Sequence, residues 1–88
     1  MLYMISVHMP GTLGLHKEFH KSLDALGQNT EVFPGTYLVN CSYTALGIRN
    51  ALARHLGQND SILIAKMLSG YCAGKLDTKA REFMLQGN

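Results

Sequence analysis

The stretch TEVFPGTYLVNC, residues 30–41, decides the fold that the sequence predicts. Two runs rich in β-branched and aromatic residues, 30–33 and 36–41, stand on either side of the dipeptide Pro34-Gly35. Such runs favour β-strands, and a Pro-Gly pair between them is typical of a tight reversal. The middle of the chain is therefore predicted to be a β-hairpin whose second strand is the longer and more buried one.

A helix is predicted on each side of this hairpin, because apolar residues recur there at the spacing of a helix face that packs on a sheet. Gly27 and Gly57 are expected to end these helices, and Ser42 or Thr44 is expected to cap the start of the second one. Its last turn is expected to contain Arg54-His55, where cations suit the helix dipole. The periodic residues are Leu15, Phe19, Leu23 and Leu26 within 13–26, and Ile48, Leu52 and Leu56 after the hairpin.

A further strand is predicted at each end of this arrangement. Residues 2–8, LYMISVH, form an apolar β-rich run before Pro10-Gly11, and residues 61–67, SILIAKM, are the most uniformly apolar run of the chain. The second run is expected to be paired on both sides. The order β-α-β-β-α-β predicts an α+β fold of the ferredoxin-like type, a four-stranded antiparallel sheet with both helices on one face.

The other face of this sheet is left open by the two helices, and it has to be covered by a second copy, a ligand or the rest of the chain. We assign residues 1–68 to the ferredoxin-like domain and residues 69–88 to a C-terminal tail. The tail begins with a loop-like segment, and Asp77 is a candidate cap for a weak helical pattern that follows. A helix that docks on a partner subunit is one expectation for it. The apolar residues of the pattern are Leu76, Ala80, Phe83 and Met84.

Length and composition indicate one soluble domain that gains stability from self-association. The chain has 88 residues, of which 47% are hydrophobic, but a domain this short buries only about 60–65% of its unfolded surface. We therefore expect at least a homodimer. No apolar run approaches the roughly 20 residues of a transmembrane helix, and the first ten residues do not resemble a secretion signal. A cytoplasmic protein is predicted in which Cys41 and Cys72 are reduced thiols, with a bridge between them as the alternative.

The charge of the chain is too low for a general attraction to nucleic acid. The net charge is +2 and charged residues make up 16% of the chain, so any contact with RNA or DNA has to be local. Lys17, Lys21 and Arg49 are the candidates for such a contact if the fold gathers them. Ordinary solvated surface charge is the alternative.

His8 is the most interesting titratable residue, because it ends the first predicted strand at an edge of the sheet. There its imidazole can reach a ligand or the same residue of a symmetry-related copy. The alternative is a histidine that is hydrogen-bonded to the adjacent loop or half-buried at an interface.

His16 and His20 are four positions apart on the first predicted helix, a spacing at which two imidazoles can hold a metal ion between them. A third ligand is missing nearby in the sequence. No metal site is therefore assigned, these two residues are weak candidates, and solvent-facing histidines are the alternative.

The chain resembles a known protein family in four short segments: YMISVH (3–8), TYLVN (36–40), IRNAL (48–52) and NDSILI (59–64). It is similar to the small SinR-type and VapD-type proteins, relatives of the small CRISPR-associated endonuclease family, over about residues 2–74. The resemblance implies a ferredoxin-like domain that dimerises and holds or cleaves nucleic acid. In some members it implies a metal-dependent ribonuclease or a toxin.

One departure from that family bears on activity. In the nuclease-type members an Asp closes the first strand and binds the metal at the dimer axis, whereas this sequence has His8 at that position. Mg²⁺ prefers oxygen ligands, so the change predicts loss of metal-dependent cleavage, which we favour, or acid and base catalysis by two His8 rings. No cofactor is assigned, and Mg²⁺ or Mn²⁺ enters only if the protein is a nuclease.

The function predicted from these observations is that of a homodimer associated with RNA or DNA, or of a toxin–antitoxin-type component, related to nucleases but lacking the usual metal-binding Asp. The alternative is a non-catalytic module that binds a second protein and regulates it. Whether the chain is an enzyme is left open by the sequence.

Overall fold

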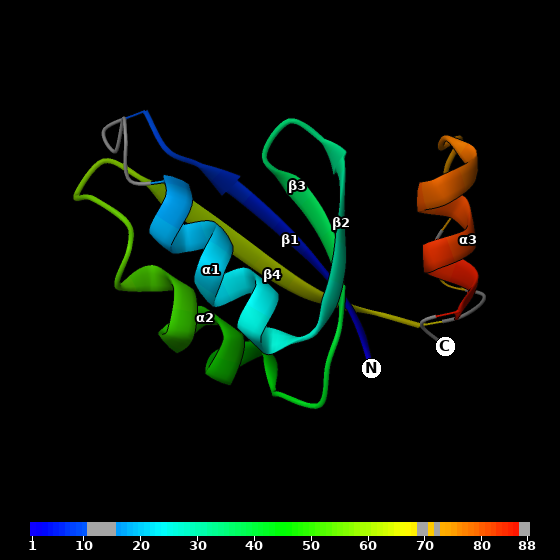
Figure 1. Ribbon diagram of the computed structural model, residues 1–88, viewed down its shortest axis with the longest axis horizontal. Helices are drawn as coiled ribbons and strands as arrows, with labels where there is room; N and C mark the ends of the chain where they lie inside the picture. The colour runs from blue at the N-terminus through cyan, green and yellow to red at the C-terminus, as the bar shows by residue number, and fades with distance from the viewer. Residues whose placement is uncertain (11–15, 69–70, 72, 87–88) are drawn as a thin grey trace.

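The computed structural model describes residues 1–10, 16–68, 71 and 73–86 of the chain. In chain order, the elements of this part are β1 (Leu2–His8), α1 (His16–Leu26), β2 (Gln28–Phe33), β3 (Thr36–Asn40), α2 (Ala45–Ala53), β4 (Ser61–Met67) and α3 (Thr78–Gln86) (Figure 1). The predicted start of the first helix, residues 13–15, lies outside the described residues.

The strands of the described chain form one antiparallel sheet in the order β2-β3-β1-β4. β1 is central, since Ile5 pairs with Tyr37 of β3 on one side and with Ile64 of β4 on the other. α1 and α2 lie together on one face of the sheet (Figure 1). Each of them connects two strands that have a third strand between them, which is the ferredoxin-like arrangement. The predicted α+β, ferredoxin-like fold is thereby confirmed.

The pairing of β4 differs from the prediction that this strand is paired on both sides. It lies at the edge of the sheet beside β1, with no second neighbour among the described residues. Ile62 and Ile64 pack against the core, whereas Leu63 between them is 61% exposed on the other face. Both faces of β4 are apolar although the strand lies at the edge of the sheet. Its apolar sequence therefore wrongly indicated a central strand.

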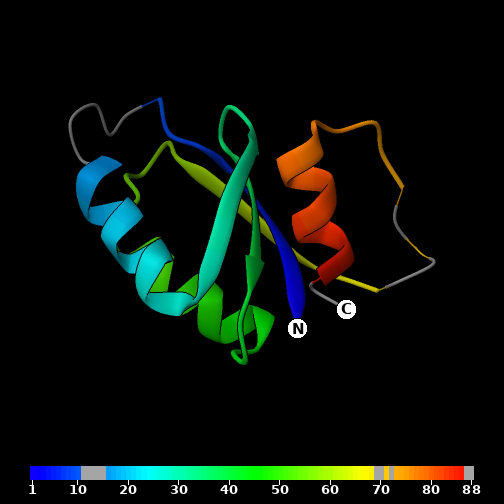
Figure 2. The ribbon, with the colours of Figure 1, turned by 45° about the vertical axis from the view of Figure 1, so that its right-hand side comes forward.

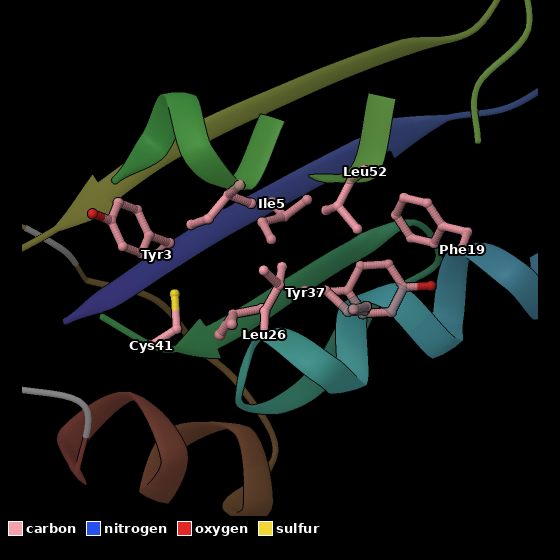
Figure 3. Close-up of a cluster of buried hydrophobic side chains, with 10 residues drawn as sticks. Tyr3, Ile5, Phe19, Leu26, Tyr37, Cys41 and Leu52 are labelled. Carbon is pink, nitrogen blue, oxygen red and sulfur yellow. The ribbon is translucent and has the colours of Figure 1, made fainter. Parts of the chain in front are cut away.

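The core lies between the sheet and the layer formed by α1 and α2 (Figure 3). Strand side chains alternate between the two faces, and Tyr3 and Ile5 of β1 enter this core. Each large apolar side chain buried there stabilises the fold by about 1.5–3 kcal/mol. The helix residues that are completely buried are those whose spacing predicted a buried face: Phe19, Leu23, Ile48 and Leu52.

The ends of α2 confirm one prediction and correct another. Thr44 is the N-cap, and its side chain accepts a hydrogen bond from the Gly47 amide at 3.0 Å. The helix ends at Ala53, so Arg54-His55 lie beyond its last turn. The amides of His55 and Leu56 donate to carbonyls three residues earlier, which closes the chain into a tighter turn than an α-helix allows.

The opposite face of the sheet carries α3 (Figure 2). This helix contacts β2 and β3, and Ala80 is buried there. The Ala80 amide donates to Asp77 Oδ1 at 2.8 Å, so the predicted cap is present. The C-terminal tail therefore folds on the sheet of its own chain, which is one of the three coverings predicted for this face. Residues 69, 70 and 72 of the predicted loop lie outside the described residues.

Cys41 is a buried free thiol. Cys72 lies outside the described residues, so a bridge between the two is neither supported nor contradicted. In the part of the chain that the structure describes, no helix is both long enough and apolar enough to cross a membrane.

The reversal between β2 and β3 is held against the central strand. Gly35 has a φ of +81°, in the left-handed region that glycine adopts without strain. Its carbonyl accepts a hydrogen bond from the Val7 amide at 2.8 Å. A Cβ atom on Gly35 would lie 2.6 Å from the Val7 carbonyl oxygen, so a side chain is excluded on two grounds. The tight reversal predicted at Pro34-Gly35 is confirmed.

Gly35→Ala is expected to lower the free energy of unfolding by about 1–3 kcal/mol, because the new Cβ strains the backbone and crowds Val7. Denaturant unfolding followed by circular dichroism measures this change. The control is Gly74→Ala, since Gly74 has no positive φ and an added Cβ there would make only ordinary contact with Leu76, at 3.7 Å from its Cγ atom. A Gly35→Ala protein as stable as the wild type would contradict the constraint assigned to this turn.

Candidate functional site

His8 lies at the end of β1 on the face of the sheet opposite α1 and α2. Tyr3 and Ile5 enter the core, so the alternation of strand side chains places Ser6 and His8 on the other face. His8 is exposed and stands opposite Ser61 of β4 in the strand register. Its ring has no hydrogen-bond or ion-pair partner within the described part of the chain, so both ring nitrogens are available to a ligand.

Hydroxyl groups from three strands lie near His8. Ser6 Oγ is 3.2 Å from Thr36 Oγ1 of β3, and Ser61 lies beside His8 on β4. Ser6, His8 and Ser61 also line a shallow hollow of about 230 Å³ between β1 and β4. We call Ser6, His8, Thr36 and Ser61 the His8 patch. The strand register thus brings one imidazole and several hydroxyls to the same end of the sheet.

The His8 patch is chemically suited to an oxyanion. Hydroxyl groups and an imidazole N–H donate hydrogen bonds, which is what phosphate oxygens accept. No carboxylate belongs to the patch or lines its hollow. Among the residues that the structure describes, no group of three or more His, Cys, Asp or Glu side chains could hold a metal ion. Protein sites for Mg²⁺ are built on carboxylates, so the residues of this patch in a single chain do not fit Mg²⁺.

The three basic residues predicted to contact nucleic acid lie on the helix layer, on the face opposite His8. Lys17 and Lys21 are exposed on α1, and Arg49 is exposed on α2. Lys21 Nζ is 3.6 Å from Glu18 Oε1, and Arg49 donates to Asn50 Oδ1 at 3.2 Å. The structure therefore does not bring these residues together with His8 into one site.

His16 and His20, the weak candidates for metal ligation, both belong to α1. The side chain of His16 lies outside what the structure describes. His20 is half-buried at the rim of the core, where its ring packs edge-on against Phe19 and Tyr37 at centroid distances of 5.8 and 5.7 Å. Its Nε2 atom is 3.5 Å from the Tyr37 hydroxyl. His20 thus has aromatic and hydroxyl neighbours and not the solvent-facing position expected as the alternative.

The Tyr37 hydroxyl lies at the polar rim of the core, between α1 and β2. Burial of this residue raises the pKa of the Tyr37 phenol to about 12, and the negative charge of Glu31 and hydrogen bonding to that carboxylate act in the same direction. The phenol is therefore held in its protonated form. It is a hydrogen-bonding group at neutral pH and not a general base.

A second histidine contact joins the two helices. Ser22 Oγ on α1 is 2.7 Å from Nε2 of His55, which follows α2. Arg54 Nε donates to the same ring nitrogen at 3.4 Å. A nitrogen that accepts from two donors carries no proton of its own, which assigns the proton of the neutral ring to Nδ1. This contact has the atoms of a serine–histidine pair, but its position makes it a tie between α1 and the end of α2.

The sequence indicated His8 but not the hydroxyls around it. Ser6, Thr36 and Ser61 are small polar residues on three different strands, and only the strand register shows that they share a face with His8. The signal available in the sequence was the alternation within residues 2–8, which places Ser6 and His8 on one side. The contributions of β3 and β4 cannot be obtained from that alternation.

No protein-family model, no curated protein and no solved structure matches the chain.

Tyr37→Phe is expected to change how stability depends on pH in the alkaline range. Unfolded tyrosine loses its proton near pH 10, whereas folded Tyr37 keeps it until about pH 12. The stability associated with this raised pKa is fully present below about pH 10 and is lost as the pH rises to about 12. Chemical unfolding across this range should show the wild type losing stability relative to Tyr37→Phe. Tyr43→Phe, at an exposed tyrosine, is the control, and parallel curves for wild type and Tyr37→Phe would contradict the assignment.

Proposed function

We propose that the protein is a homodimer that binds RNA or DNA through the His8 patch and that it has lost the metal-dependent cleavage of the nuclease family it resembles. The observation that carries this proposal is the exposed, unpaired imidazole of His8 among hydroxyl groups, at the position where that family has a metal-binding Asp. A role as a toxin–antitoxin-type component is compatible with such binding.

The chemistry of the patch supports binding more than metal-dependent cleavage. Ser6 and Thr36 share one hydrogen bond, so one hydroxyl proton of that pair, together with the donors of Ser61 and His8, can be given to a phosphate group. Contacts to phosphate position a nucleic acid without reading its sequence. A net charge of +2 makes such contacts local and dependent on salt.

Catalysis without a metal is the alternative. If two His8 rings meet across a dimer axis, one can accept the proton of a ribose 2′-hydroxyl as its oxygen attacks phosphorus. The other can then donate a proton to the departing 5′-oxygen.

The dimer is supported by the unequal cover of the second sheet face. α3 contacts β2 and β3, whereas β4 is an edge strand with unpaired backbone groups among the described residues. Leu63 is 61% exposed on β4, and Leu68 just beyond it is 51% exposed. A second copy placed against this half of the face would cover Leu63 and bring the two His8 patches near each other.

The second candidate function is a non-catalytic module that binds another protein. The same edge strand favours it, because an exposed β4 can pair with an extended segment of any partner. It differs from the first candidate in requiring no contact with nucleic acid.

His8→Ala is expected to weaken binding of a fluorescein-labelled single-stranded RNA or duplex DNA by about tenfold, because each subunit loses a charge-assisted hydrogen bond to the nucleic acid. Fluorescence anisotropy measures it, and affinity should fall as salt rises from about 50 to 200 mM. Arg49→Ala is the comparison on the helix layer and should retain most of the affinity. If Arg49→Ala loses binding and His8→Ala keeps it, the site lies on the other face and the role of His8 is excluded.

Cleavage of end-labelled RNA is tested with the wild type and with substitutions of His8. The RNA should stay intact with wild-type protein in Mg²⁺, Mn²⁺ or chelator. His8→Asp, which would place a carboxylate at the proposed dimer axis, should gain Mg²⁺-dependent cleavage that His8→Asn lacks. Cleavage by the wild type that persists in chelator and disappears in His8→Ala would replace the proposed loss of activity by imidazole catalysis. No binding at low salt would favour the protein-binding module.

Leu63→Glu is expected to convert the dimer to a monomer, because it places a charge in the proposed interface. Light scattering coupled to size-exclusion chromatography measures the mass. Leu46→Glu is the matched control: Leu46 is 63% exposed, on α2, away from this face. A wild-type monomer at all concentrations, or a Leu63→Glu protein that remains dimeric, would contradict this interface.

A further inference from the structure

A cavity of about 240 Å³ lies between α3 and the face of the sheet that it covers. Met4 of β1 and Leu38 of β3, which are cross-strand partners, line it from the sheet. Leu76 and Met84 line it from the C-terminal segment, and Met67 lines it from the end of β4. The cavity is separate from the His8 patch, with which it shares only Thr36.

The contact between α3 and the sheet lies beside this space. Ala80 is buried at the contact, and the residues four positions before and after it are Leu76 and Met84. These two longer side chains line the cavity from the C-terminal segment. Methionine side chains are unbranched and adapt to the shape of a ligand.

The lining is apolar except for the Thr36 hydroxyl and one lysine. Lys75 is the one charged side chain among the described residues that line the cavity, and it is exposed at the rim. Within the described chain no carboxylate lies within ion-pair distance of it. An apolar interior with a free lysine at its rim is complementary to a ligand that has an apolar body and one negative charge.

The volume restricts the size of that ligand. A cavity of about 150 Å³ in an apolar core holds benzene, whereas drug-sized ligands occupy pockets of about 300 Å³ or more. The space under α3 lies between these limits. We propose that it is a binding site for a small apolar carboxylate, such as a medium-chain fatty acid, with the chain between Met4, Leu38 and Met84 and the carboxylate at Lys75.

The five methionines of the chain provide the first test. Protein labelled with ¹³C at the methionine methyl groups is titrated with decanoate below its micelle concentration and observed by NMR. Saturable shifts are expected for Met4, Met67 and Met84, which line the cavity. Met9, which packs against the core on the other face, and Met1 should not shift. Equal shifts at all five methyl groups, or none, would overturn the proposal.

Variants separate the two parts of the site. Gly74→Leu should abolish binding, because Gly74 lines the cavity and an added Cβ makes only ordinary contacts with Leu76, so the longer side chain can enter the space without disturbing the fold. Lys75→Gln should weaken decanoate binding by about two- to fivefold, the contribution of one exposed ion pair. It should leave decanol binding unchanged. Lys79→Gln, at an exposed lysine of α3 outside the lining, is the control for charge.

Three results would contradict this site. Decanoate shifts that survive Gly74→Leu, in a variant shown by circular dichroism to be folded, would place the ligand elsewhere. Equal effects of Lys75→Gln and Lys79→Gln would remove the carboxylate from Lys75. Shifts of the three methionines on concentrating the protein without decanoate would make a second copy of the chain the occupant.

Discussion

The central position of β1 is the constraint on which the rest of the structure depends. β1 pairs along its length with β4 and over most of it with β3, so its backbone groups are satisfied on both sides and its side chains are assigned strictly to two faces. Tyr3 and Ile5 enter the core under α1 and α2, while Met4, Ser6 and His8 belong to the other face. A register shift by one residue would bury His8 and expose Ile5. The hydrogen bond from Val7 to Gly35 adds a tie between this strand and the β2–β3 turn.

The second face of the sheet is divided into two unequal parts by α3. Over β2 and β3 the helix covers the sheet and encloses an apolar cavity with Met4 and Leu38 on its floor. Over β1 and β4 the face remains accessible, with Leu63 in its middle and His8 at its end. The two proposed sites of the protein therefore lie on the same face of the sheet, with Met4 in one and Ser6 and His8 in the other along β1, and Thr36 belongs to both.

The histidines illustrate how the fold separates structural from available imidazoles. Of the three whose side chains the structure describes, His20 lies beside the Tyr37 hydroxyl and His55 contacts Ser22. Both contacts lie in or beside the helix layer and join elements that are distant in the sequence. His8 has no such partner among the described residues, and it is the one whose surroundings suit a ligand.

The sequence by itself determined the order of the elements, the helix faces that are buried and the turn at Pro34-Gly35, because periodicity and turn chemistry are local properties. It also singled out His8 as the end of the first strand. It placed β4 in the centre of the sheet, since an apolar run does not distinguish a strand with two neighbours from an edge strand with two apolar faces. Only the tertiary structure decided that Thr36 and Ser61 lie near His8, that Lys17, Lys21 and Arg49 do not, and that α3 lies over a cavity. These relations depend on strand register and helix packing, which join residues tens of positions apart and leave no pattern in either segment alone.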